Sequence, residues 1–212
     1  MRTSVAGVLS LSLLAAPAAA QNECLKDARM PDVGQWAEYE GVINKKDPYT
    51  VRYAVVGSEE REGKEMKWME MRMTGKKKDQ NMVYQVLTPG SPAEMDQVQE
   101  MVFKPGDKQA MKMNGMMMKM IRGQLKKNSA LSDLCEGTTP MGEESVTVPA
   151  GTFKATRFHN SKHQSDTWIV PRMAFFMVKS KGKDYEFNLA SSGDGAKSSI
   201  SETAQEMGGP GK

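Results

Sequence analysis

Apolar and polar residues alternate through the first half of the chain in a pattern typical of antiparallel β-strands. Tyr49, Val51 and Tyr53 would share one face of such a strand, with Thr50 and Arg52 on the other. The pattern predicts strands at residues 35–43, 49–56, 64–74 and 81–88. Polar, turn-like segments separate these strands, so we predict an antiparallel meander.

The strand predicted at residues 64–74 carries methionine on both faces. Met69, Met71 and Met73 would lie on one face, with Met66 and Trp68 on the other. Because several strands are apolar on both sides, the sequence leaves open which face points inward.

Strands are predicted again in the last third of the chain. Residues 143–158 form a predicted hairpin that turns at Pro149-Ala150-Gly151, and the alternation of Tyr185 with Phe187 indicates a late strand. The remaining strands are predicted at residues 166–170, 174–180, 183–189 and 197–201.

Two short helices are predicted between these groups of strands. Residues 91–94 form a capping box with proline at the first helical position, followed by Met95, Val98, Met101 and Val102 on one face. The second helix, at residues 116–127, would have Asn114 as its N-cap.

We therefore predict an α+β fold, in which a curved antiparallel sheet forms an unclosed β-barrel of about nine or ten strands. The two short helices, inserted mid-chain, would act as a lid over its open face. We assign residues 21–202 to a single half-barrel domain and residues 203–212, rich in glycine, to a disordered tail.

The first twenty residues have the features of a secretory signal peptide. Arg2 is followed by an apolar run and then by Ala18-Ala19-Ala20 as a cleavage site. We predict cleavage near Ala20 and a periplasmic or secreted protein. In that oxidising environment, Cys24 and Cys135 are expected to form a disulfide, which Ellman titration of unreduced protein would test.

Charge and motifs exclude several function classes. The net charge of +3, which falls by one when the signal is removed, gives no electrostatic basis for binding nucleic acid. Motifs of serine hydrolases, zinc proteases and phosphate-binding loops are missing, so we expect no enzyme and no cofactor. His159 and His163, the two histidines, are interpreted as turn residues rather than metal ligands.

Three stretches stand out as motifs: VTVPAGTFKATRF, DTWIVPRMAFFMVKSKGKDYEFNLA and, upstream, GQWAEY at residues 34–39. They resemble the periplasmic outer-membrane lipoprotein-sorting or carrier (LolA/LolB-type) half-barrel family. The resemblance implies a half-barrel in which a helical lid covers an apolar cavity that shields acyl chains. The chain departs from the family at residues 173–176 (MAFF), where the family often has Pro-Phe-Gly.

The hypothesis that we place first is an exported carrier or chaperone for an apolar guest, either a lipid or the acyl chains of a lipidated protein. Methionine is flexible and polarisable, so a cluster of methionines suits guests of varied shape. A basic helix at residues 116–127 could also touch an anionic membrane surface during unloading. The predicted lining or lid residues are Trp68, Met69, Met71, Met73, Tyr84, Met117, Met118, Ile121, Phe175 and Phe187.

Two alternatives remain open at this point. Thioethers are soft ligands that suit Cu(I), so the cluster Met111, Met113, Met116, Met118 and Met120 could serve a copper-handling protein. The methionines could instead simply fill core volume in an envelope interaction module without a ligand.

Overall fold

One twelve-stranded sheet dominates the computed structural model, which describes residues 31–89, 97–127 and 137–207. The strand order is β12-β6-β5-β4-β3-β2-β1-β11-β10-β9-β8-β7, so the two edge strands are β12 and β7. The strands are β1 (Trp36–Ile43), β2 (Asp47–Arg61), β3 (Lys64–Gly75), β4 (Met82–Thr88), β5 (Glu100–Pro105), β6 (Met111–Lys112), β7 (Thr138–Val148), β8 (Gly151–Asn160), β9 (Ser165–Ile169), β10 (Met177–Lys181), β11 (Tyr185–Gly193) and β12 (Gln205–Glu206).

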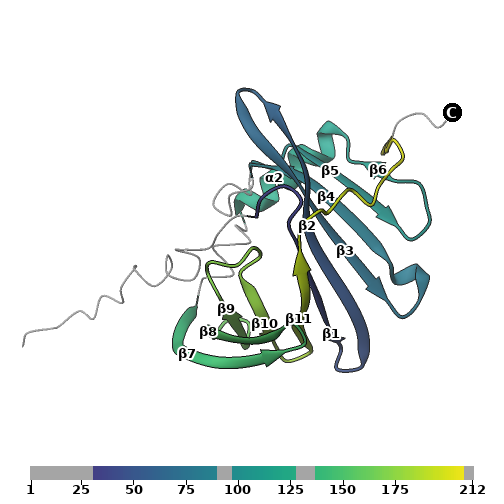
Figure 1. The fold of residues 1–212 in the computed structure, drawn as a ribbon. Coiled ribbons are helices and arrows are strands. Elements are labelled where there is room, and N and C mark those ends of the chain that lie inside the picture. The colour runs from purple at the N-terminus through teal and green to yellow at the C-terminus, as the bar shows by residue number, and fades with distance from the viewer. Residues whose placement is uncertain (1–30, 90–96, 128–136, 208–212) are drawn as a thin grey trace, which may run out of the picture.

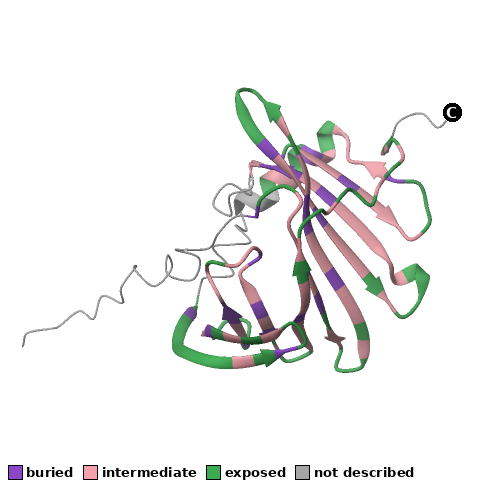
Figure 2. Ribbon diagram, viewed as in Figure 1, coloured by how far each residue is buried: buried purple, intermediate pink, exposed green. Residues whose placement is uncertain are grey.

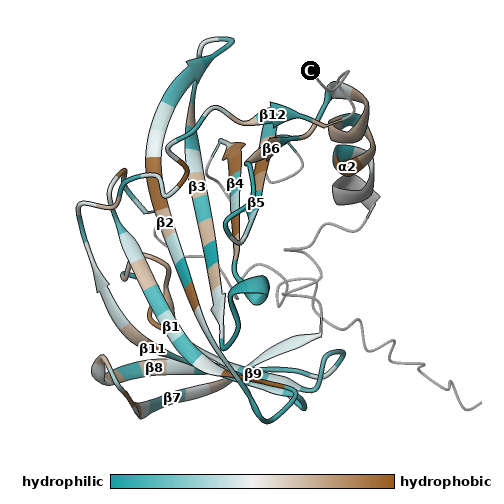
Figure 3. Cartoon of the chain, turned by 90° about the vertical axis from the view of Figure 1, so that its right-hand side faces the viewer, coloured by the Kyte–Doolittle hydropathy of each residue, from teal (hydrophilic) through white to brown (hydrophobic). Residues whose placement is uncertain are grey.

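The sheet is strongly curved and open. Strands β1 to β6 form one wall, and β7 to β11 curl round below it, as Figures 1 and 3 show. Neighbouring strands pair antiparallel, except that β12 runs parallel to β6. The curl brings the two walls together, so that the concave face becomes the inside of the fold.

Several strands form where the alternation predicts them, whereas the strand predicted at residues 174–180 begins only at Met177. In β2, Val51 and Val55 are buried, and Tyr53 between them packs against the core. The β7–β8 hairpin turns between Val148 and Gly151, which pair directly, as predicted for Pro149-Ala150-Gly151. Gly151 has a φ of 133°, a conformation that favours glycine.

Helix α2 (Gly115–Lys127) begins as predicted at Asn114. The Asn114 side-chain oxygen accepts a hydrogen bond from the Met117 backbone N–H at 3.0 Å, which is the N-cap interaction. The helix lies beside the end of the sheet formed by β6 and β12 (Figure 3). Its Met118 side chain is buried, whereas Met116 and Met120 are exposed.

The predicted fold class is wrong in three respects. The sheet has twelve strands rather than nine or ten, it is mixed rather than purely antiparallel, and no pair of helices forms a lid over the described residues. Within the described part of the chain, α2 is the single α-helix, accompanied by one short 3-10 turn, η1 (Lys78–Gln80). The prediction of a curved, open sheet agrees with the structure.

The C-terminal end of the first predicted helix is a strand in the structure. Met101 and Val102 lie in strand β5, which pairs with β4 from Glu100 to Pro105. The exposed edge of β4 offers backbone hydrogen bonds to this segment, and pairing there outweighs its weak helical spacing. The predicted capping box at residues 91–94 lies outside the described residues.

The remaining predictions concern the two ends of the chain and the cysteines. The signal peptide at residues 1–20 and the Cys24–Cys135 disulfide both lie in segments that the structure does not describe. The predicted strand at residues 197–201 is absent, because this segment runs across the sheet without joining it. The segment predicted as a disordered tail contributes strand β12 and is described as far as Met207.

The main core lies where β1 and β2 face the lower wall. Its buried members share apolar side chains on the concave side and are Ala37, Tyr39, Val55, Val148, Phe175, Val178 and Leu189. Figure 2 shows buried positions on both walls, while β3, β4 and β5 are otherwise mostly half-buried and β7 is mostly exposed.

Candidate functional site

The register of the sheet gathers methionine and aromatic side chains on one face of β3 to β6. Residues directly opposite each other in a ladder share a face, and Met71 pairs with Tyr84, which in turn pairs with Phe103. Alternation along each strand extends this face. We call it the methionine face, and it consists of Met69, Met71, Met73, Met82, Tyr84, Val86, Met101, Phe103 and Met111.

The methionine face is apolar but only half-buried. All nine of its side chains are intermediate in exposure. On β3 and β4 the deeply buried residues lie mostly on the opposite face, including Met66, Glu70, Gln85 and Leu87. This distribution inverts the usual one, in which an apolar face is the buried face and polar side chains meet water.

The opposite face is buried because the C-terminal strap (residues 194–207) crosses it. Ser199 binds Glu70 through both its backbone N–H and its hydroxyl, at 2.9 and 2.6 Å. The Gln85 amide donates to Glu70 and to Ser198, each at 2.7 Å. Figure 1 shows the strap in yellow passing in front of the sheet, with α2 behind it. The methionine face is therefore the one that the strap leaves uncovered.

At its β2 side the methionine face meets an aromatic cluster of the core. The Tyr53 ring lies 5.9 Å from the Tyr39 ring and 6.2 Å from the Phe175 ring, and Met69 packs against the same cluster. The Tyr39 hydroxyl bonds to the carbonyl oxygens of Phe175 and Met177 at 3.0 and 2.9 Å. Burial raises the pKa of both tyrosines, so their hydroxyls stay protonated at physiological pH.

Phe175 occupies a strained backbone conformation in this cluster. Its φ is 57°, which is rare for a bulky side chain. The loop between β9 and β10 is held by hydrogen bonds from the Val170 N–H to the Phe176 carbonyl and from the Phe176 N–H to the Met173 carbonyl. The loop thus folds inward and places Phe175 in the core, with Val170, Met173 and Ala174 packed against it.

The predicted lining residues separate into three groups. Met69, Met71, Met73 and Tyr84 all lie on the methionine face, and Phe175 and Phe187 join the adjoining core with Met69. Trp68 lies on the opposite face, paired with buried Leu87. On α2, Met118 is buried, whereas Met117 and Ile121 are half-buried.

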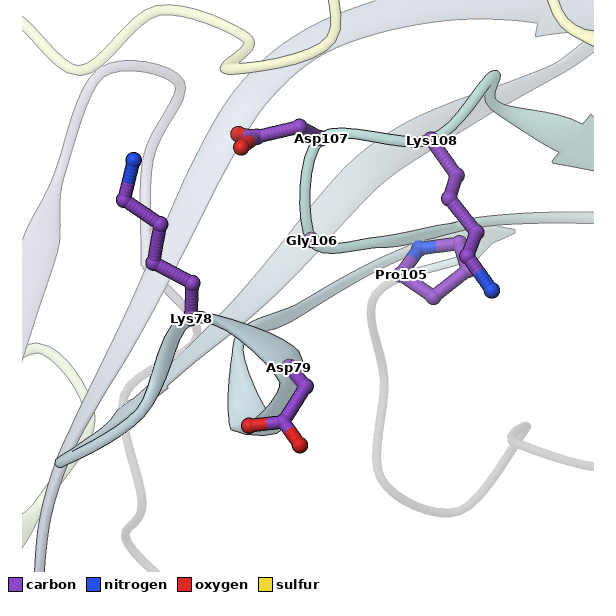
Figure 4. Close-up of a pocket in the computed structure, with 6 residues that line it drawn as sticks. All are labelled: Lys78, Asp79, Pro105, Gly106, Asp107 and Lys108. Carbon is purple, nitrogen blue, oxygen red and sulfur yellow. The ribbon is translucent and has the colours of Figure 1, made fainter.

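A surface cleft of about 360 Å³ lies at the turn end of the sheet (Figure 4). Its walls come from the η1 turn and the β5–β6 turn, with Gly106 donating its N–H to the Asn81 carbonyl at 2.8 Å. The lining residues are Lys78, Asp79, Pro105, Gly106, Asp107 and Lys108, none of which belongs to the predicted site. Figure 4 shows the Asp79 and Asp107 carboxylates pointing in different directions rather than converging on one point.

The five methionines of the copper hypothesis do not converge on one point. Met116 and Met120 are 84% and 60% exposed on the outer side of α2, whereas Met118 is 3% exposed and points inward. Met111 lies on the methionine face in β6. Among the described residues, no group of three or more histidine, cysteine, aspartate and glutamate side chains is placed to hold a metal.

A charged cluster on β8 and β9 was not predicted from the sequence. Arg157 contacts Asp166 through two guanidinium nitrogens at 3.2 and 3.1 Å, and His159 Nδ1 lies 3.0 Å from the same carboxylate. Burial of Asp166 disfavours its charge, but the hydrogen bonds from Arg157 and His159 outweigh burial and hold its pKa below the usual value. His159 thus lies in a strand as the partner of an acid, while His163 lies in an exposed turn, as predicted.

The buried carboxylate of Glu70 was also missed. Its position between Met69 and Met71 indicates only that it faces away from them, as polar strand residues usually face water. No local pattern reveals that a segment more than a hundred residues later would cover it.

Comparisons with known proteins give limited similarity. An exported-protein candidate with a YmcC-like fold from Bacteroides fragilis aligns with a TM-score of 0.35 and 10% identity, covering 77% of this chain and 97% of that one. A lipoprotein candidate from Parabacteroides distasonis aligns with a TM-score of 0.36 and 11% identity, covering 79% and 98%. No protein-family model and no curated protein matches the chain, so the resemblance to the lipoprotein-sorting family is not confirmed.

No helix in the described part of the chain is both long and apolar enough to cross a membrane.

Proposed function

We propose that this protein is a non-catalytic carrier or chaperone that holds an apolar guest, such as a lipid or the acyl chain of a lipidated protein, against the methionine face. The observation that carries the proposal is the inverted burial of β3 and β4. A partly exposed sheet face of nine methionine, aromatic and valine side chains costs solvation free energy unless something covers it. A guest that covers this face removes that cost.

The composition of the face suits an acyl chain better than a rigid ligand. Six of its nine side chains are methionines on the adjacent strands β3 to β6: Met69, Met71, Met73, Met82, Met101 and Met111. Unbranched thioether side chains can adopt many rotamers and so fit guests of different length and shape. Affinity would come from burial, at about 25 cal/mol per Å² before the costs of ordering.

The proposed place of action is the periplasm or the exterior of the cell, in keeping with the signal peptide predicted at residues 1–20. An anionic lipid surface is the proposed partner for unloading. The outer side of α2 supports this partner, because Met116 and Met120 project into solvent beside the exposed Lys119.

A binding titration with cis-parinaric acid, a fluorescent fatty acid, tests the proposal. Met71 lies in the middle of the methionine face, between Met69 and Met73 along β3 and between Tyr53 and Tyr84 across the sheet. We expect saturable binding by the wild type and a dissociation constant at least tenfold higher for Met71→Asp. Placing a charge beneath an apolar chain costs more than the 1.4 kcal/mol that a factor of ten represents.

Thr74→Asp is the matched control, because Thr74 is exposed and lies on the opposite face of the same strand. It should change the dissociation constant less than twofold. Circular dichroism and urea midpoints show whether both variants fold. If Met71→Asp does not fold, Tyr84→Ala serves as a second test. Absence of saturable binding to the wild type, or equal affinities for Met71→Asp and Thr74→Asp, would overturn the proposal and favour an interaction module.

A further inference from the structure

The C-terminal strap connects the buried centre of the sheet to the start of α2. Its first half is anchored by Glu70, which is 6% exposed and accepts three hydrogen bonds. Two come from Ser199 and one comes from the Gln85 amide, which also binds Ser198. Such an anchor is strong because a buried carboxylate that loses its donors is left uncompensated in the protein interior.

The second half of the strap is held by contacts that are more exposed. Glu202 pairs with Lys104 at 2.7 Å, and the Gln109 amide donates to the Thr203 carbonyl at 2.8 Å. Strand β12 has only two residues, both exposed, and its ends are held by backbone bonds from Gln205 to Ala110 and from Met207 to Lys112. Segments with few buried contacts open locally before the rest of a protein unfolds.

The strap ends on the residue that caps α2. The Asn114 side-chain nitrogen donates to the Met207 carbonyl at 2.9 Å, while its oxygen accepts from the Met117 N–H at 3.0 Å. One amide group therefore holds the end of the strap and the first turn of the helix together. If the strap departs, Asn114 loses the partner that fixes its rotamer, and the helix loses part of its cap.

We infer that the C-terminal strap is a latch that fixes the N-terminus of α2 beside the methionine face and that its release frees the helix to move. The first half of the latch lies on the face that carries Glu70, its end forms the edge strand β12 beside β6, and Asn114 joins that end to α2. Met111 of the methionine face lies in β6, three residues before Asn114. Opening the latch would thus loosen the border of the methionine face and make it more accessible. Only this last step depends on the proposed function.

Two substitutions separate latching from capping. Asn114→Asp keeps an oxygen that can cap α2 but removes the N–H donor to Met207, whereas Asn114→Ala removes both. Glu70→Gln acts at the far end of the strap, where it weakens the bonds to Ser199 without contacting α2. Ser199→Ala is a milder change at the same contact, for use if Glu70→Gln does not fold.

Hydrogen exchange of the full chain, followed by mass spectrometry, measures the coupling without any guest. We expect Asn114→Asp to raise exchange of residues 205–207 at least tenfold while changing residues 117–119 less than threefold. Asn114→Ala should raise both at least tenfold. Glu70→Gln, or Ser199→Ala in its place, should raise exchange in the strap and also, at least threefold, in the first turn of α2.

Glu143→Gln is the control, because Glu143 forms an exposed ion pair with Lys154 on β8, far along the sheet. It should leave exchange in both segments unchanged. If the variants at Glu70 or Ser199 loosen the strap but leave α2 at wild-type exchange rates, the latch is refuted.

Stopped-flow mixing with cis-parinaric acid then tests access to the methionine face. Glu70→Gln should raise the association rate at least threefold, with Glu143→Gln unchanged. If Glu70→Gln raises hydrogen exchange in both the strap and α2 but leaves the association rate of cis-parinaric acid unchanged, the latch does not control access to the methionine face. If no variant binds the probe, the proposed function fails, while the latch is still judged by exchange alone.

Discussion

Replacing Tyr39 by phenylalanine tests how the loop between β9 and β10 is held against the core. The Tyr39 side chain is 1% exposed, and its single hydroxyl proton is shared between the carbonyl oxygens of Phe175 and Met177. The substitution keeps the ring and removes only this donor. The Phe175 carbonyl retains a hydrogen bond from the Met177 N–H, so the main loss falls on the Met177 carbonyl.

The expected cost of Tyr39→Phe is about 2 kcal/mol in the free energy of unfolding. A lost hydrogen bond accounts for about 0.5–1.5 kcal/mol, and the partly buried Met177 carbonyl, left without this donor, adds to this cost. For a domain of this size, such a loss lowers the melting temperature by roughly 4–8 °C. Because burial raises the pKa of Tyr39, its hydroxyl is protonated at both pH 6 and pH 9, and the loss should be equal at the two values.

Urea denaturation followed by far-ultraviolet circular dichroism measures this free energy. Tyr185→Phe is the matched control, since the Tyr185 hydroxyl is half-buried and has only a 3.4 Å contact with Ser180. It should cost less than about 0.5 kcal/mol. Hydrogen exchange should also increase in the loop between β9 and β10 for Tyr39→Phe alone. A loss below about 0.5 kcal/mol for Tyr39→Phe would refute the role of this hydroxyl in holding the loop.

Two further outcomes follow from the structure. Gly41→Ala should destabilise the fold by about 3 kcal/mol or more in urea unfolding, because an added Cβ would lie 1.8 Å from the Glu186 carbonyl oxygen across the β1–β11 ladder. Gly57→Ala, where the nearest atom is 4.0 Å away, should cost far less, and equal costs would contradict the close approach. Because the pKa of Asp166 is lowered in the folded state, its contribution is present above about pH 4 and disappears as pH falls through its folded pKa. The stability difference between wild type and Asp166→Asn should therefore be largest near pH 7 and shrink towards pH 3, whereas a constant difference would exclude this linkage.

Local sequence pattern was sufficient for much of the sheet and for the start of α2. Alternation in β2 and β3 is encoded residue by residue, since successive strand side chains point to opposite faces. The Asn114 cap and the Pro149-Ala150-Gly151 turn likewise depend on residues within a few positions of each other. These features need no information from distant parts of the chain.

Strand β5 shows where local pattern failed. The segment from Glu100 to Pro105 has apolar spacing compatible with a helix, and only the free edge of β4 makes it a strand. Strand β12 pairs with β6 for the same reason, although its sequence carries no strand signal. An unpaired sheet edge supplies hydrogen-bonding groups that no short window of sequence can reveal.

The candidate site was likewise found only in part. The sequence placed Met69, Met71 and Met73 on one face, because alternation alone fixes that grouping. Which face is buried depended on tertiary structure: the strap covers Glu70 and leaves the methionines half-exposed. Strand period assigns side chains to faces, but burial is decided by whichever distant segment lies against each face.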